Sequence, residues 1–180
     1  MRLAMEFKQL DSICLKALPF GFMLKTCSKE NMLEVIPFLR RNFPGDWQGE
    51  IEKYCSGVGK QELFSLYSAN MPVASALAQT TAAKIGILSM VAVDPNYRQR
   101  GLGKAVVSAA LDFFRRAGQD RVVLVTDSGR IGAIGFYLKL GFRPLILDQE
   151  QAKFWGGVLK KVKFSWSEEG SVFAAKAGME

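Results

Sequence analysis

Residues 98–104, RQRGLGK, are of types that could bind a polyphosphate. They follow an apolar, strand-like run and open a helical pattern, so several backbone N–H groups have no partner within the helix. These groups also lie at the positive end of the helix dipole. The two glycines carry no Cβ atom that would hold a phosphate away, and two arginines and a lysine add full positive charges. The segment therefore predicts a site for a pyrophosphate-sized anion.

Two other phosphate-binding loops fit this segment less well. The dinucleotide fingerprint requires a third glycine three residues after Gly103, where Val106 stands. A P-loop requires a glycine five residues before its Gly-Lys pair and a serine or threonine after it. Arg98 and Ala105 occupy those positions, so both alternatives are excluded.

The remaining pattern, R-x-x-G-x-G between a strand and an amphipathic helix, resembles the GCN5-related N-acetyltransferase (GNAT) family. Residues 85–111, IGILSMVAVDPNYRQRGLGKAVVSAAL, match the family's fourth strand, turn and third helix. Residues 133–145, AIGFYLKLGFRPL, match its fourth helix and sixth strand, whose pattern is Ala-x-x-x-Tyr-x-x-x-Gly-Phe. The likeness covers residues 85–147. It implies an acyl-CoA-dependent N-acyltransferase that transfers acetyl from acetyl-CoA to a primary amine by direct attack.

The resemblance also implies which residues bind coenzyme A. The backbone of two strand residues would pair with the pantetheine arm, and residues 98–104 would hold the pyrophosphate. Arg130 stands where many members of the family have asparagine, and could instead meet a phosphate or point to solvent. The implied cofactor site consists of Val91, Val93, Arg98, Gln99, Arg100, Gly101, Leu102, Gly103, Lys104, Arg130, Ala133, Phe136 and Tyr137.

Tyr137 matches the family tyrosine that protonates the departing thiolate. A phenol with a pKa near 10 stays protonated at neutral pH, and a thiolate can accept its hydrogen bond. The alternative is a core tyrosine, because the surrounding helix is apolar nearly all round. Gly132 and Gly135 lie inside the same helix and each costs about 1 kcal/mol relative to alanine. Close approach of the cofactor or of a neighbouring segment is a reason for both glycines.

The general base is missing from its usual place in the family, a glutamate on the fourth strand. Residues 71–93 contain no carboxylate, and Ser89 is the only polar side chain well inside the stretch Ile85–Val93. We expect proton removal through ordered water, with Ser89 in the relay. The alternative is a carboxylate from a variable loop: Asp46, Glu50, Asp148 or Glu150.

Composition excludes several other chemistries. The chain contains no histidine, so Ser–His and Cys–His nucleophile pairs and histidine-bound metals are excluded. Its three cysteines are far apart and form no CxxC motif, so we expect small buried residues and no metal. The net charge of +7 favours anionic partners, but the basic residues are scattered, and we expect no nucleic-acid binding. No uncharged run is long enough for a membrane span. We expect a cytoplasmic protein without a membrane partner.

The elements that would position these residues alternate between strands and helices. Strands are predicted over 22–28, 62–68, 73–79, 84–93, 121–126, 142–147 and 158–166. Helices are predicted from Ser28 or Asn31 onward despite Pro37, and over 47–54, 101–117 and 130–140, the last capped by Asp127 or Ser128. Residues 1–20 read as a helix or an arm, residues 21–166 as the acetyltransferase domain and residues 167–180 as a flexible tail.

The expected fold class is α/β, with a mixed sheet of six to seven strands. By resemblance, its central parallel pair would splay apart, and helices would cover both faces. A non-catalytic acyl-CoA-binding regulatory module of the same fold remains the alternative function. The expected partner is a small-molecule amine or a peptide amine, and the expected assembly is a monomer or homodimer.

Overall fold

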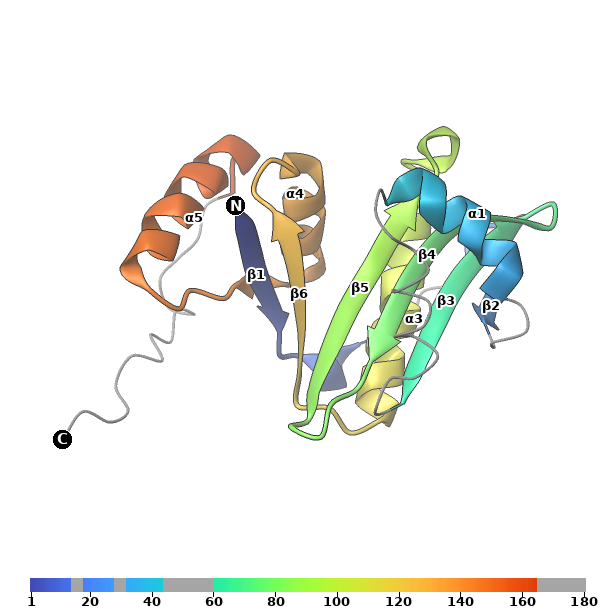
Figure 1. Ribbon diagram of the computed structural model, residues 1–180, viewed down its shortest axis with the longest axis horizontal. Helices are drawn as coiled ribbons and strands as arrows, with labels where there is room; N and C mark the ends of the chain where they lie inside the picture. The colour runs from blue at the N-terminus through green and yellow to red at the C-terminus, as the bar shows by residue number, and fades with distance from the viewer. Residues whose placement is uncertain (14–17, 28–31, 44–59, 165–180) are drawn as a thin grey trace. The chain divides into compact units, whose positions relative to one another are not determined.

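The computed structural model describes residues 1–13, 18–27, 32–43 and 60–164. Its strands form one seven-stranded sheet with the hydrogen-bonded order β2-β3-β4-β5-β6-β1-β7 (Figure 1). The chain forms two compact units, one of Lys8–Val123 and one of Met1–Phe7 with Leu124–Glu180. The predicted mixed α/β sheet is confirmed. The predicted helix over residues 47–54 lies outside the described residues.

The larger unit is built on four consecutive antiparallel strands. These are β2 (Met23–Cys27), β3 (Gln61–Ser68), β4 (Met71–Gln79) and β5 (Ile85–Val93). β5 then pairs in parallel with the start of β6 (Arg121–Asp127). This parallel pairing joins Ile85, Gly86 and Ile87 to Arg121, Val122 and Val123. The predicted central parallel pair is therefore confirmed.

Helices cover both faces of this part of the sheet, α1 (Met32–Asn42) on one and α3 (Leu102–Arg116) on the other (Figure 1). Successive side chains of a strand point to opposite faces. Leu63 of β3 accordingly packs in the cluster that contains α1 residues, whereas the next residue, Phe64, meets Phe113 of α3 with ring centroids 6.1 Å apart. Both predicted helices are confirmed, and α1 contains Pro37.

The α3 helix packs closely against β5 because of one glycine. A Cβ atom at Gly86 would lie 2.5 Å from Cδ1 of Phe114, so only glycine admits the buried ring at this position. The opposite side of α3 carries Asp112, whose carboxylate pairs with Arg115 at 2.8 Å and Arg116 at 2.9 Å. Burial raises the pKa of Asp112, but the hydrogen bonds from the two arginines outweigh it, so the pKa lies below its usual value.

The smaller unit contains β1 (Arg2–Phe7), α4 (Ile131–Leu140), β7 (Arg143–Pro144), α5 (Gln149–Val162) and the last residues of β6. β1 pairs antiparallel with β7. The rings of Phe7 and Phe142 lie 5.3 Å apart in its core. Residues 2–7, for which the sequence left a helix or an arm open, are thus a strand of the sheet, followed by a short 3-10 helix over Leu10–Ser12.

Three predictions in the smaller unit were wrong. The strand predicted over 158–166 is the end of α5, because Ala152, Trp155, Leu159 and Val162 recur at helical spacing. The Asp148 side chain begins this helix by accepting the Gln151 N–H at 2.7 Å. The strand predicted over 142–147 is confined to Arg143–Pro144. The N-cap of α4 is Arg130, without a side-chain hydrogen bond, and not Asp127 or Ser128.

Candidate functional site

The C-terminal end of β5 presents backbone groups on the side away from β4. The Asp94 N–H donates to the Val73 carbonyl at 2.8 Å, and Ala92 pairs with Ser75. Because N–H and C=O groups alternate along a strand, those of Val91 and Val93 point away from β4. This is the orientation that the predicted pairing of these two residues with a pantetheine arm requires.

The chain then turns through two left-handed residues before α3 begins. Gln99 has φ 60° and Gly101 has φ 78°, and Gly101 is the N-cap of the helix. The Ala105 N–H donates to the Gly101 carbonyl at 3.0 Å. The N–H groups of the first helical turn before Ala105 have no partner in the helix, and left-handed residues near such groups form an anion-binding concavity.

The two arginine side chains of this turn are anchored on backbone groups. Arg98 donates from Nε to the Val93 carbonyl at 3.3 Å, and Arg100 donates from Nη2 to the Asn96 carbonyl at 3.3 Å. The guanidinium of Arg100 also lies over the ring of Tyr97, 5.2 Å from its centroid. All three cations of the segment are exposed, as a ligand carrying several negative charges requires.

A cavity of about 400 Å³ adjoins this turn and extends the site beyond the sequence prediction. Arg41, from the last turn of α1, and Arg100 both line it, together with the carboxylate-bearing Asp94. Arg41 is about sixty residues away in sequence, so no local pattern could have predicted its presence here. Tyr97 lies directly before Arg98 in the sequence, and an aromatic residue so close to two arginines is a local signal for the stacking of Arg100 on its ring. The remaining lining residues are Met71, Pro72, Val73, Asn96 and Tyr97.

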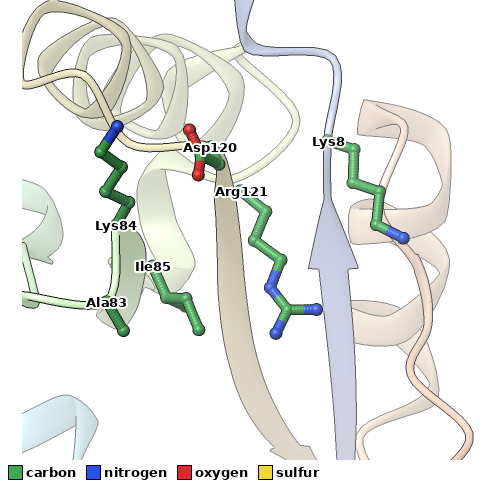
Figure 2. Close-up of a pocket in the computed structure, with 6 residues that line it drawn as sticks. All are labelled: Lys8, Ala83, Lys84, Ile85, Asp120 and Arg121. Carbon is green, nitrogen blue, oxygen red and sulfur yellow. The ribbon is translucent and has the colours of Figure 1, made fainter. Parts of the chain in front are cut away.

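A second cavity, of about 330 Å³, lies where β5 and β6 begin, at the opposite strand ends from the turn (Figure 2). Lys8, Lys84 and Arg121 give it a basic lining, together with Ala83, Ile85 and Asp120. The side chains do not converge: in Figure 2, Arg121 extends in the opposite direction from Lys84 and Asp120. The cavity is therefore a basic hollow and not a built anion site.

Tyr137 lies in the smaller unit, on α4, and is 8% exposed. Its ring contacts those of Phe136 and Phe142, at centroid distances of 5.3 and 5.6 Å. Burial raises the pKa of Tyr137 to about 12, although the nearby charge of Arg130 lowers it. The phenol is therefore protonated throughout the physiological range, as a proton donor must be.

The two glycines of α4 have different surroundings. A Cβ atom at Gly135 would lie 2.8 Å from Cγ1 of Val162 in α5, so close packing explains this glycine. No atom lies within 4 Å of a Cβ placed at Gly132. Of the other predicted contact residues on α4, Ala133 and Phe136 are half-buried, and Arg130, its N-cap, is exposed.

The candidates for the general base are placed differently. Ser89 is half-buried on β5, paired with Leu77. Asp148 caps α5, and Glu150 is exposed in the first turn of that helix. Asp46 and Glu50 lie outside the described residues. The structure thus adds no carboxylate to β4 or β5, where the family's glutamate would stand.

The described part of the chain contains no group of three or more metal-ligating side chains. Within the same residues, no helix is long and apolar enough to cross a membrane.

Cys27 is buried, and its Sγ donates to the Ser65 hydroxyl at 3.6 Å. Burial raises the pKa of this thiol, although its hydrogen bonds with Ser65 and Tyr67 lower it.

The chain is similar to known acetyltransferases in sequence. Residues 32–142 match the model of the acetyltransferase (GNAT) family. Mycothiol acetyltransferase from Saccharomonospora viridis is 36% identical over 69 residues, which are 38% of this chain and 22% of that protein. An uncharacterized N-acetyltransferase from Methanocaldococcus jannaschii is 34% identical over 70 residues, 39% of this chain and 29% of that protein. The matches thus span less than a third of the relatives' own length.

Solved structures show the same fold. A GCN5-related N-acetyltransferase from Sphaerobacter thermophilus superposes with a TM-score of 0.68 at 20% identity, covering 80% of this chain and 48% of that one. The ribosomal-protein-S18-alanine N-acetyltransferase from Escherichia coli superposes with a TM-score of 0.60 at 22% identity, covering 69% and 79%. Because the two sequences are only 20% and 22% identical to this chain, the similarity to these structures shows the fold alone.

Proposed function

This chain belongs to the acetyltransferase (GNAT) family, and we propose that it transfers the acetyl group of acetyl-CoA to a primary amine by direct attack. The observation that carries the proposal is the turn at the end of β5. Left-handed Gln99 and Gly101, the start of α3 and three cations together fit the charge and the size of a pyrophosphate. Bound coenzyme A would supply a thioester as the acetyl donor.

The residues of the larger unit bind and orient the donor in this proposal. Arg98, Arg100 and Lys104 offset the pyrophosphate charge, and the first N–H groups of α3 donate hydrogen bonds to its oxygens. Backbone groups of Val91 and Val93 pair with the amide groups of the pantetheine arm. The contacts that we assign to Arg130, Ala133 and Phe136 come from α4 and its N-cap.

Two side chains handle protons in the proposed reaction. The amine nitrogen forms a bond to the acetyl carbon, the C–S bond breaks, and the phenol of Tyr137 donates its proton to the departing sulfur. The amine loses its own proton to a water molecule, for which we assign the Ser89 hydroxyl as hydrogen-bonding partner. The raised pKa of Tyr137 keeps its phenol protonated at neutral pH, so the proton is present when the thiolate departs.

We propose a small-molecule amine as the acceptor. The named relatives with sequence similarity support this choice, since the matching mycothiol acetyltransferases are named for a small molecule. The E. coli structural neighbour, named for a ribosomal protein, is similar in fold only. The thiol-release assays should therefore include both small amines and peptides as acceptors.

Calorimetry with coenzyme A, followed by thiol-release assays, tests the proposal. We expect coenzyme A to bind, with affinity falling as salt rises, and thiol release to depend on a small amine. Release with peptides but not with small amines would overturn the choice of acceptor. Binding without turnover on any amine would favour the non-catalytic module. No binding would refute the proposed cofactor.

A further inference from the structure

β5 contains one residue more than β4 requires, and that residue is Met90. Leu77 of β4 pairs with Ser89, but Ser75, two residues before it, pairs with Ala92, three residues further along β5. Met90 adopts φ 50°, in the left-handed region. The strand therefore has a β-bulge at Met90, just before the residues that we assign to the pantetheine arm.

A methionine is an unfavourable residue for this bulge. Bulges with a left-handed residue normally have glycine there, because a Cβ atom strains this backbone conformation. Such strain persists only where surrounding contacts hold it. The Met90 side chain supplies one such contact, because it packs against the buried cluster that contains Phe38 and Leu77.

Ser75 supplies the second contact. Its hydroxyl is fully buried on β4 and donates to the Met90 carbonyl at 2.7 Å. A bulge leaves its extra residue outside the regular ladder of hydrogen bonds, and a buried carbonyl without a donor is costly. The Ser75 side chain therefore replaces the ladder hydrogen bond that the bulge removes.

The bulge decides which backbone groups β5 presents beyond it. The backbone N–H and C=O groups of successive strand residues point in opposite directions. One extra residue therefore reverses the direction in which these groups point in every later residue of the strand. With the bulge, Asp94 faces β4, as its hydrogen bond to Val73 shows, and Ala92, two residues before it, has the same orientation. Val91 and Val93 consequently face away. In a strand without the extra residue, the two pairs would exchange roles.

We infer that Ser75 is a positioning residue for coenzyme A: its hydroxyl holds the Met90 bulge, which turns the backbone of Val91 and Val93 toward the pantetheine arm. This inference rests on the proposed function. Ser75 itself touches no reacting atom. Its effect should therefore fall on donor binding and the KM for acetyl-CoA, with little effect on the KM for the amine.

The test compares Ser75→Ala with a matched control, Ser65→Ala. Ser65 is a fully buried serine on the neighbouring strand β3, and its hydroxyl accepts from Cys27 and lies outside the bulge. We expect Ser75→Ala to weaken coenzyme A binding about tenfold in calorimetry and to raise the KM for acetyl-CoA similarly. Ser65→Ala should change stability without changing either value by more than about twofold. Equal affinities for the two variants would overturn the inference.

A second variant separates the bulge from general loss of stability. In the Ser75→Ala background, Met90→Gly removes the backbone strain, since glycine adopts positive φ without penalty. We expect it to recover part of the lost coenzyme A affinity even if the melting temperature falls further. Affinity that falls in step with stability would contradict the inference.

Hydrogen exchange distinguishes failure of this inference from failure of the proposed function. The Ala92 and Asp94 amides, which face β4, should exchange faster in Ser75→Ala than in Ser65→Ala, with no ligand present. Unchanged exchange would refute the role of Ser75. Faster exchange would confirm that Ser75 holds the bulge even if the protein did not bind coenzyme A. The absence of binding would then refute the proposed function and, with it, the role of the bulge in coenzyme A binding.

Discussion

Gly135 of α4 lies directly against Val162 of α5, so that a Cβ atom at position 135 would come within 2.8 Å of Cγ1 of the valine. Valine is stiff at this position because it is β-branched. We expect Gly135→Ala to lower the free energy of unfolding, although alanine favours helix formation. Urea denaturation of the intact chain measures the change.

The matched control is Gly156→Ala on α5, where no atom lies within 4 Å of the added methyl group. This change should raise the free energy of unfolding by about 1 kcal/mol, the helix-propensity difference. If Gly135→Ala stabilises the protein as much as Gly156→Ala does, the two helices do not pack as described.

Gly132→Ala separates packing from cofactor binding. Position 132 has space for a methyl group, so the variant should gain about 0.5–1 kcal/mol of stability from helix propensity. If coenzyme A approaches α4 closely here, its affinity should nevertheless fall. Thermal melting and calorimetry on one preparation measure both effects. Higher stability with unchanged affinity would remove Gly132 from the cofactor site.

The two glycines of the anion-binding turn should respond differently to substitution. Gly101 has φ 78°, so any side chain there strains the backbone and lowers stability as well as affinity. Gly103 lies within α3, where a side chain is compatible with the backbone. We expect Gly103→Val to fold normally by circular dichroism and to bind coenzyme A at least tenfold more weakly. Unchanged binding would show that no phosphate approaches this position.

Tyr137→Phe tests the proton donor. We expect kcat to fall by about 100-fold, a typical contribution of a general acid, with little change in coenzyme A affinity. Wild-type activity should show no loss of this donor up to about pH 10, because burial places its pKa at about 12. A kcat equal to that of the wild type would leave Tyr137 a core residue only.

The same raised pKa predicts how stability changes in alkali. The unfolded phenol ionises near pH 10 and the folded one near pH 12, so folding retains a proton between these values. Tyr137 should therefore add to stability below pH 10 and lose that contribution as pH rises toward 12. Urea denaturation at pH 8 and 11 should show a smaller decrease for Tyr137→Phe than for the wild type.

Asp112 should lose its contribution to stability in acid, whereas Tyr137 loses its contribution in alkali. Its pKa is lowered in the folded state because the hydrogen bonds from Arg115 and Arg116 outweigh the effect of burial. Its contribution is present at neutral pH and disappears as pH falls through the lowered pKa. Asp112→Asn should cost about 1 kcal/mol or less at pH 7, because both arginines are largely exposed, and should cost less at pH 3. An equal cost at both pH values would contradict this.

Much of the fold could be predicted from the sequence because its signals are local. The glycine after the last residue of α4 has φ 103°, as a helix C-terminus followed by Gly-Phe indicates. Local patterns did not predict the end of α5, where the sequence indicated a strand over residues 158–166. Gly156 and Gly157 weaken the helical pattern, and the remaining alternation of apolar and basic residues fits a strand equally well.

The sequence by itself determined the turn over residues 98–104, because its glycines, cations and flanking elements are neighbours along the chain. Only the tertiary structure decided that Arg41 joins this turn at a cavity, that Val162 explains Gly135, and that Ser75 holds Met90 in a bulge. Each of these relationships joins residues that are 15 or more positions apart. They depend on strand register and helix packing, which local patterns do not specify.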